Sequence, residues 1–147
     1  MIKLNSNGYV NSIGHKKIIA AANHFIGLLL SKTVAKNTEV VISLKKLPKE
    51  FNGFCQINDK EPNPYNPKSF LIEINGLINI VDMIKTLSHE FVHLRQFRTK
   101  ELGYRDSYTT FRGVAYRANL PYHQHPWEKE AYKLEKSLLK SYLKTVV

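Results

Sequence analysis

The sequence predicts one small α+β domain, and three observations lead to this prediction. The chain has 147 residues, a length typical of a single domain, which would span residues 1–147. Hydrophobic residues make up 43% and charged residues 23%, close to the composition of ordinary globular proteins. Helical and strand-like patterns follow one another in the order helix, strands, helix, loop, helix.

In the first half of the chain we expect one helix and three strands. The helix is expected over residues 13–33, where apolar residues recur at three- and four-residue spacing. Residues 39–47 are rich in alternating Val and Ile and predict a strand, which Pro48 ends. Two further strands are predicted, a short one over residues 51–57 and one over residues 69–74.

The second half is predicted to hold two helices separated by a loop. The first of them begins after Asn79, whose side chain is a good N-cap, and ends between residues 98 and 102. Residues 103–126 are expected to be mainly loop, with room for one strand at 109–117. The last helix is expected over residues 127–143.

The motif that carries chemistry is His89-Glu90-Phe91-Val92-His93 in the middle of the first of these helices. Histidines four residues apart lie on one face of a helix, one turn from each other, where both imidazoles can reach one ion. The glutamate next to the first histidine projects beside the metal, where it can accept a proton from a metal-bound water without being a ligand. The sequence therefore predicts a divalent metal site, with zinc as the expected ion and one ion per chain.

A catalytic zinc site needs a third protein ligand, and the candidates lie near the start of the last helix. They are Glu128 and Glu130 on the helix and His123 and His125 just before it. The lysines of this helix form one narrow stripe, at positions 129, 133, 136, 140 and 144. At about 100° per residue, Glu128 lies somewhat further from that stripe than Glu130 does, which favours Glu128 as the ligand. Glu130, His125 and His123 stay open as alternatives.

Residues 89–96 (HEFVHLRQ) and 126–131 (PWEKEA) together resemble small gluzincin-type zinc metallopeptidase-like proteins, including the short SprT-like proteins that many phages encode. The resemblance covers roughly residues 69–135. It implies that the third ligand is a glutamate three residues before an alanine, which is the position of Glu128. Tyr132 stands where many of these proteins have an acidic or amide residue, so the hydrogen-bond partner of one histidine is left open.

The resemblance also implies a fold, a minimal zincin-like domain. It would consist of an N-terminal helix, a small and mostly antiparallel sheet, the metal-binding helix and a C-terminal helix with the third ligand. The strand before the metal-binding helix, residues 69–74, would lie along the active-site cleft and pair with an extended substrate.

The expected function is hydrolysis of a peptide bond by a zinc-activated water, with Glu90 as general base and a protein or peptide as substrate. The side chains considered as oxyanion donors or substrate contacts are Tyr116, Tyr122 and Gln96, with Tyr104, Tyr108 and His123 in the same region. The alternative is a non-catalytic, metal-containing module that binds protein or DNA on the same fold. In that case His125 or His123 could supply a fourth ligand and close the site.

The charge and the distribution of apolar residues limit which partners and which cellular compartment we expect. The formal charge of +10 and the lysine stripe would suit contact with nucleic acid, although no recognition motif accompanies them. The most apolar segment, residues 18–30, is shorter than the ~20 residues that span a bilayer, so no membrane partner is expected. The polar first ten residues and the single Cys55 favour a protein that is not secreted. We therefore expect a cytoplasmic protein, and the phage resemblance suggests an infected bacterial cell.

Overall fold

The computed structural model describes residues 1–146, and within them the chain is an α+β protein, as the sequence predicts. It has two sheets where one was expected. Most predicted elements are found with small shifts at their ends. The elements are β1 (Ile2–Asn5), α1 (Ser12–Leu29), α2 (Lys32–Lys36), β2 (Glu39–Lys45), β3 (Gly53–Ile57), β4 (Ser69–Asn75), α3 (Ile80–Arg98), β5 (Leu102–Arg105), β6 (Tyr108–Phe111), β7 (Val114–Arg117), the short 3-10 helix η1 (Tyr122–Gln124) and α4 (Pro126–Thr145).

The larger sheet has the strand order β1-β2-β4-β3, and the expectation of a mostly antiparallel sheet is wrong. β1 pairs with β2 and β2 with β4 in parallel, and only β3 runs antiparallel to β4. The helices α1 and α2 connect β1 to β2, and such a helical crossover returns the chain in the same direction. The sequence analysis missed β1, which has four residues and buries only Leu4.

The free edge of this sheet near α3 belongs to β3. β4, which was expected to pair with an extended substrate, lies between β2 and β3 and has both edges hydrogen-bonded. The expectation is therefore corrected: a chain that extends the sheet at this side can pair only with β3.

Two predicted segments are divided in the structure. The helix expected over residues 13–33 ends at Leu29, and Ser31 starts the separate helix α2 by accepting a hydrogen bond from the Val34 amide at 3.3 Å. The region expected to be mainly loop forms the small antiparallel sheet β5-β6-β7. Its second hairpin turns at Arg112 and Gly113, which have φ values of 50° and 82° and match a two-residue turn with positive φ at both positions. Arg-Gly is not a typical sequence for this turn, which explains why one strand was expected across it.

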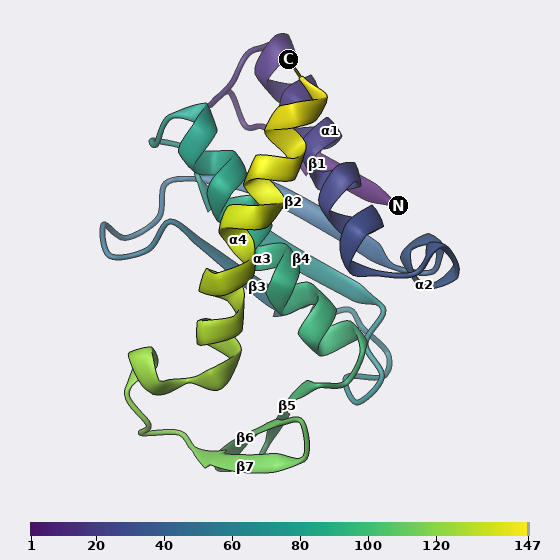
Figure 1. The fold of residues 1–147 in the computed structure, drawn as a ribbon, viewed down its shortest axis with the longest axis vertical. Helices are drawn as coiled ribbons and strands as arrows, with labels where there is room; N and C mark the ends of the chain where they lie inside the picture. Colours follow the sequence, from purple (N-terminus) through teal and green to yellow (C-terminus); the bar gives the residue numbers. More distant parts are fainter. Residues whose placement is uncertain (147) are drawn as a thin grey trace.

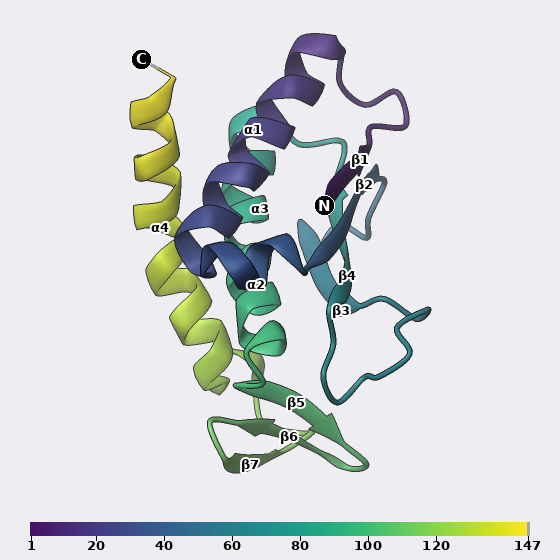
Figure 2. The same cartoon turned by 90° about the vertical axis from the view of Figure 1, so that its right-hand side faces the viewer.

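The elements form three layers. α1 and α3 cover one face of the four-stranded sheet, and α4 packs on the side of these helices that faces away from the sheet (Figures 1 and 2). The β5–β7 sheet lies at one end of the molecule, next to the end of α3 and the start of α4. None of the helices in residues 1–146 is long and apolar enough to cross a membrane.

The core lies between the helices and the sheet, and Phe91 of α3 is at its centre. Its side chain is fully buried, and its ring centroid lies 6.4 Å from that of Phe25 on α1. Phe91 belongs to the same helical turn as His89 and His93, so core packing holds the face of α3 with the two histidines in place.

Replacing Phe91 by Ala is expected to lower the free energy of unfolding by about 3–5 kcal/mol, because a large cavity is left in the core. Urea denaturation followed by circular dichroism measures this. Val81→Ala is the matched control on the same helix, since Val81 is exposed, and a change within about 0.5 kcal/mol is expected there. Equal effects of the two substitutions would contradict the placement of Phe91 in the core.

Candidate metal centre

The two histidines of the motif lie on a helix that is capped as the sequence predicts. The Asn79 side chain accepts a hydrogen bond from the Asp82 amide at 2.9 Å, and α3 then runs through the motif to Arg98. His89 and His93 are both buried, and their ring centroids are 4.9 Å apart. The helix thus presents both imidazoles to α4.

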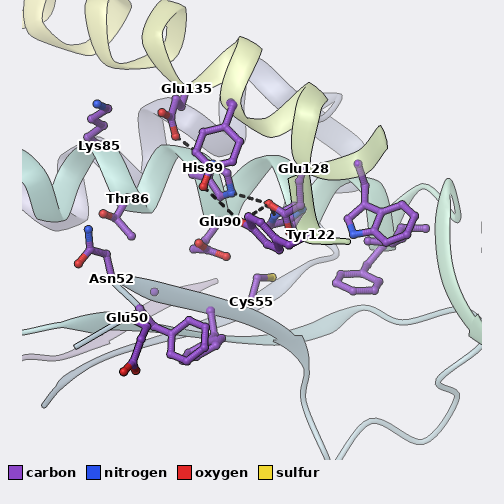
Figure 3. A pocket seen from close by; sticks show the side chains of 18 of the residues that line it. Glu50, Asn52, Cys55, Lys85, Thr86, His89, Glu90, Tyr122, Glu128 and Glu135 are labelled. Atoms are coloured by element: carbon purple, nitrogen blue, oxygen red, sulfur yellow. Dashed lines mark hydrogen bonds and ion pairs between the residues drawn. The ribbon is translucent and has the colours of Figure 1, made fainter. Parts of the chain in front are cut away.

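Glu128, in the first turn of α4, completes a group of three. Its Oε1 atom lies 2.9 Å from His89 Nε2 and 3.0 Å from His93 Nε2 (Figure 3). One potential ligand atom from each of the three residues lies within 4.8 Å of the others. Ligand bonds of about 2.0–2.2 Å to one tetrahedral ion separate the ligand atoms by roughly 3.3 Å, so this group is within reach of a single ion.

The other candidates for the third ligand point elsewhere. Glu130 forms ion pairs with Arg95, at 2.8 Å, and with Arg112. His125 Nε2 lies 2.7 Å from the carbonyl oxygen of Leu120 and its ring stacks on Trp127. His123 is exposed and, within residues 1–146, is not part of the three-residue group.

Each histidine ring has a hydrogen-bond acceptor at Nδ1, the nitrogen that does not face Glu128. His89 Nδ1 donates to Glu135 Oε2 at 2.9 Å, and His93 Nδ1 donates to Gln96 Oε1 at 2.8 Å. In the neutral imidazoles the proton therefore lies on Nδ1, and the lone pair of each Nε2 is directed at Glu128. Two lone pairs and a carboxylate that face one another repel unless a proton or a metal ion lies between them.

The pKa shifts reflect this arrangement. Burial by itself would lower the pKa values of His89 and His93, but their contacts with Glu128 outweigh it and raise both. Burial would raise the pKa of Glu128, and the two histidines instead lower it well below its usual range. The group thus favours a positive charge at its centre.

Glu135 is the important residue that the sequence analysis missed. It lies on the same face of α4 as Glu128, two turns further on, and is buried among the apolar residues of that face. The sequence contains one signal for this role: Glu135 is an acidic residue at an apolar position of an amphipathic helix. Tyr132, whose position had left the partner of one histidine open, packs edge-on against the His89 ring with centroids 4.6 Å apart.

Glu90 lies beside the group and is not one of its members. Burial raises the pKa of Glu90 to about 7, although the charges of His93 and His89 oppose the shift. Figure 3 shows its carboxylate directed into the cleft, on the side towards Cys55 of β3.

The cleft that contains these residues has a volume of about 680 Å³. Its lining includes Phe51 and, from β3, Phe54 and Cys55. Phe97, Leu102, Tyr104 and Trp127 line it as well. The three-residue group and Glu90 line this cleft, which is bounded by α3, α4 and β3 (Figure 3).

Of the proposed oxyanion donors and substrate contacts, the structure places Tyr122 next to the metal-binding group. Its hydroxyl donates to Glu128 Oε1 at 2.9 Å and lies 3.3 Å from the Tyr132 hydroxyl. Tyr116 packs edge-on against Trp127 and does not line the cleft. Gln96 is fully buried behind His93, so it supports a histidine and does not face a substrate.

Glu135→Gln is expected to weaken zinc affinity about 10- to 100-fold, because a neutral amide supports His89 less well than a carboxylate does. Competition with a chromogenic chelator measures the dissociation constant. The number of ions bound at saturating zinc should stay unchanged. Lys136→Ala, one residue further on and exposed, is the control. A zinc affinity that is equal in the wild type and in Glu135→Gln would contradict the role of Glu135.

Stability of the zinc-free protein is expected to depend on the ionisation of Glu90. Its folded-state pKa of about 7 lies above its ordinary value of 4.5, so folding favours the protonated form. The stability that this form contributes is complete below about pH 4.5 and is lost as the pH rises through 7. Glu90→Gln stays neutral, so the variant should gain stability relative to the wild type between pH 5 and 8, by up to about 3 kcal/mol. Urea denaturation in the presence of a chelator checks this, and a constant difference across that range would contradict it.

Comparisons with known protein families, with curated proteins and with solved structures give no significant match. The fold and the site therefore define the class by themselves: an α+β protein with a buried group of two histidines and one glutamate within reach of one ion.

Proposed function

We propose that this protein is a zinc-dependent metallopeptidase-like hydrolase, similar in its site to gluzincins and to SprT-like proteins. The observation that carries the proposal is the convergence of His89 Nε2, His93 Nε2 and Glu128 Oε1, with both Nδ1 atoms already donating to acceptors. A proton or a cation must lie between these atoms, and two imidazoles with one carboxylate are a donor set that zinc favours.

Three protein ligands favour a catalytic site over a closed structural one. Within residues 1–146 no fourth His, Cys, Asp or Glu joins the group. Zinc bound there would supply a Lewis acid that lowers the pKa of a water molecule and polarises a carbonyl group. Side chains of the protein would carry out the proton transfer and donate a hydrogen bond to the oxyanion.

Glu90 is the proposed general base. It would accept the proton of the attacking water and pass it to the leaving amine. Its carboxylate is buried beside the three-residue group, within the same cleft, where it can receive and return a proton next to the reacting atoms.

Tyr122 is the proposed donor to the oxyanion. Burial and the contacts with Tyr132 and Glu128 raise the pKa of Tyr122 well above its ordinary value, so the hydroxyl keeps its proton and can donate. It lines the cleft beside the metal-binding group.

An extended polypeptide is the proposed substrate. The unpaired edge of β3 can add one more strand by main-chain hydrogen bonds, and residues of this strand line the cleft. The apolar and aromatic side chains in the lining of the cleft suit a chain with large side chains.

The first experiment is the zinc content of the protein purified without chelators and without a histidine tag, by inductively coupled plasma mass spectrometry. About one zinc per chain is expected. Cleavage of an unfolded protein such as reduced casein, sensitive to a chelator and restored by zinc, then tests the activity. Absence of zinc even after dialysis against zinc would refute the proposal.

A second candidate function, contact with nucleic acid, is favoured by the outer face of α4. Its lysines are exposed, and none has an acidic partner within 4.0 Å among the described residues: Lys129, Lys133, Lys136, Lys140 and Lys144. The acids Glu128, Glu130 and Glu135 of the same helix face inwards. Binding to duplex DNA that weakens steeply with salt would support this function, and no binding at low salt would remove it.

A further inference from the structure

A chain of polar contacts connects the turn between β6 and β7 to the metal-binding histidine His93. We propose that Arg112, at this turn, is a positioning residue: through Glu130 and Gln96 it holds His93 in the orientation that binds the ion. The inference rests on the proposed function only in taking zinc as that ion.

The inner half of the connection is buried. Gln96 is fully inaccessible, and its Oε1 atom accepts the hydrogen bond of His93 Nδ1. Its Nε2 group donates to the carbonyl oxygen of Trp127 and to Glu130 Oε1, both at 3.0 Å. Because both amide protons have acceptors, the amide cannot turn its NH₂ group towards His93 without losing these bonds. The orientation of His93 therefore depends on Glu130 together with the Trp127 carbonyl group.

The outer half is an ion-pair cluster around Glu130. Its Oε1 atom also accepts from Arg95 at 2.8 Å, and its Oε2 atom accepts from Arg112. Arg112 lies 3.6 Å from Glu101 as well, so its guanidinium bridges two carboxylates. Without Arg112, Glu130 Oε2 would lose its only partner among the described residues, and the carboxylate could rotate away from Gln96.

The position of Arg112 depends on the fold of the β5–β7 sheet. The left-handed backbone at Arg112 and Gly113 makes the tight turn, and the Arg112 side chain crosses from this turn to α4. The same sheet contributes Leu102 and Tyr104 to the wall of the cleft. The β5–β7 sheet, which Figure 2 shows at one end of the molecule, thus supplies cleft residues and the Arg112 contact with Glu130.

The test measures zinc affinity of Arg112→Ala by chelator competition. We expect the dissociation constant to rise about three- to tenfold, a coupling typical of residues in one polar network. Arg112→Lys, which keeps the charge, should restore part of the affinity. Arg105→Ala is the matched control, since Arg105 is on the same sheet, has its guanidinium over the Tyr65 ring and lies outside the network. It should leave zinc affinity unchanged.

A double-mutant cycle distinguishes positioning from a general loss of stability. If Arg112 acts through Gln96, then Arg112→Ala should have no further effect on zinc affinity in a Gln96→Met background. An equal weakening in both backgrounds, or no weakening in the wild-type background, would overturn the inference. Should Gln96→Met fail to fold, Glu130→Gln serves as the second background.

A zinc-free measurement separates this inference from the proposed function. In ¹⁵N-edited NMR spectra of the zinc-free protein, the Nδ1 proton of His93 should exchange with water faster in Arg112→Ala than in the wild type or in Arg105→Ala. Unchanged exchange would refute the positioning role of Arg112. Failure of the wild type to bind zinc would refute the proposed function and leave this readout informative.

Discussion

Glu128→Ala is expected to remove the bound zinc, and Glu130→Ala is expected to retain it. Glu128 supplies the only carboxylate oxygen in the three-residue group, within 3.0 Å of both imidazole Nε2 atoms. Loss of one of three ligands leaves two, which do not make a stable zinc site. Glu130 is occupied by two arginines and does not belong to the group.

Zinc per chain after gel filtration, measured by inductively coupled plasma mass spectrometry, decides between the two glutamates. His89→Ala is the positive control for loss. Glu130→Ala should weaken affinity several-fold through Gln96, but a tight site stays filled after such a change. Zinc that stays in Glu128→Ala and disappears in Glu130→Ala would assign the third ligand to Glu130 and refute the geometry described above.

Glu90→Gln is expected to reduce the rate of peptide hydrolysis by about 10²- to 10⁴-fold while zinc remains bound. Glutamine has nearly the same size and keeps the packing, but its amide cannot accept the proton of the attacking water. Because Glu90 is not a member of the metal-binding group, the zinc content should equal that of the wild type. Initial rates on a fluorogenic casein, with zinc content determined on the same samples, measure both quantities.

Cys55→Ala is the matched control for this substitution. Cys55 lines the same cleft from β3, and its thiol is un-ionised because burial raises its pKa well above the ordinary value. A rate within a few-fold of the wild type is expected. Wild-type activity in zinc-loaded Glu90→Gln would eliminate Glu90 as the base. Zinc binding without cleavage by the wild type would favour the non-catalytic binding module.

Local sequence patterns were sufficient to predict features that depend only on residues close together in the sequence. The spacing of His89 and His93 and the cap at Asn79 both follow from helix geometry, and α3 contains them as predicted. The alternation over residues 39–47 likewise predicts β2. The same reasoning gave no information about the order and direction of strands, because pairing joins residues far apart in sequence. The parallel sheet and the open edge of β3 could therefore not be predicted.

The sequence by itself determined the two-histidine motif, the adjacent Glu90 and the amphipathic helix that carries Glu128. Only the tertiary structure decided how α3 and α4 face each other. That packing brings Glu128 to His89 across 39 residues and Glu135 to the same ring across 46 residues. It also turns Glu130 to the arginines and encloses Gln96 behind His93. Helical periodicity gives the face on which a side chain lies, and the distance between two faces depends on how the core packs.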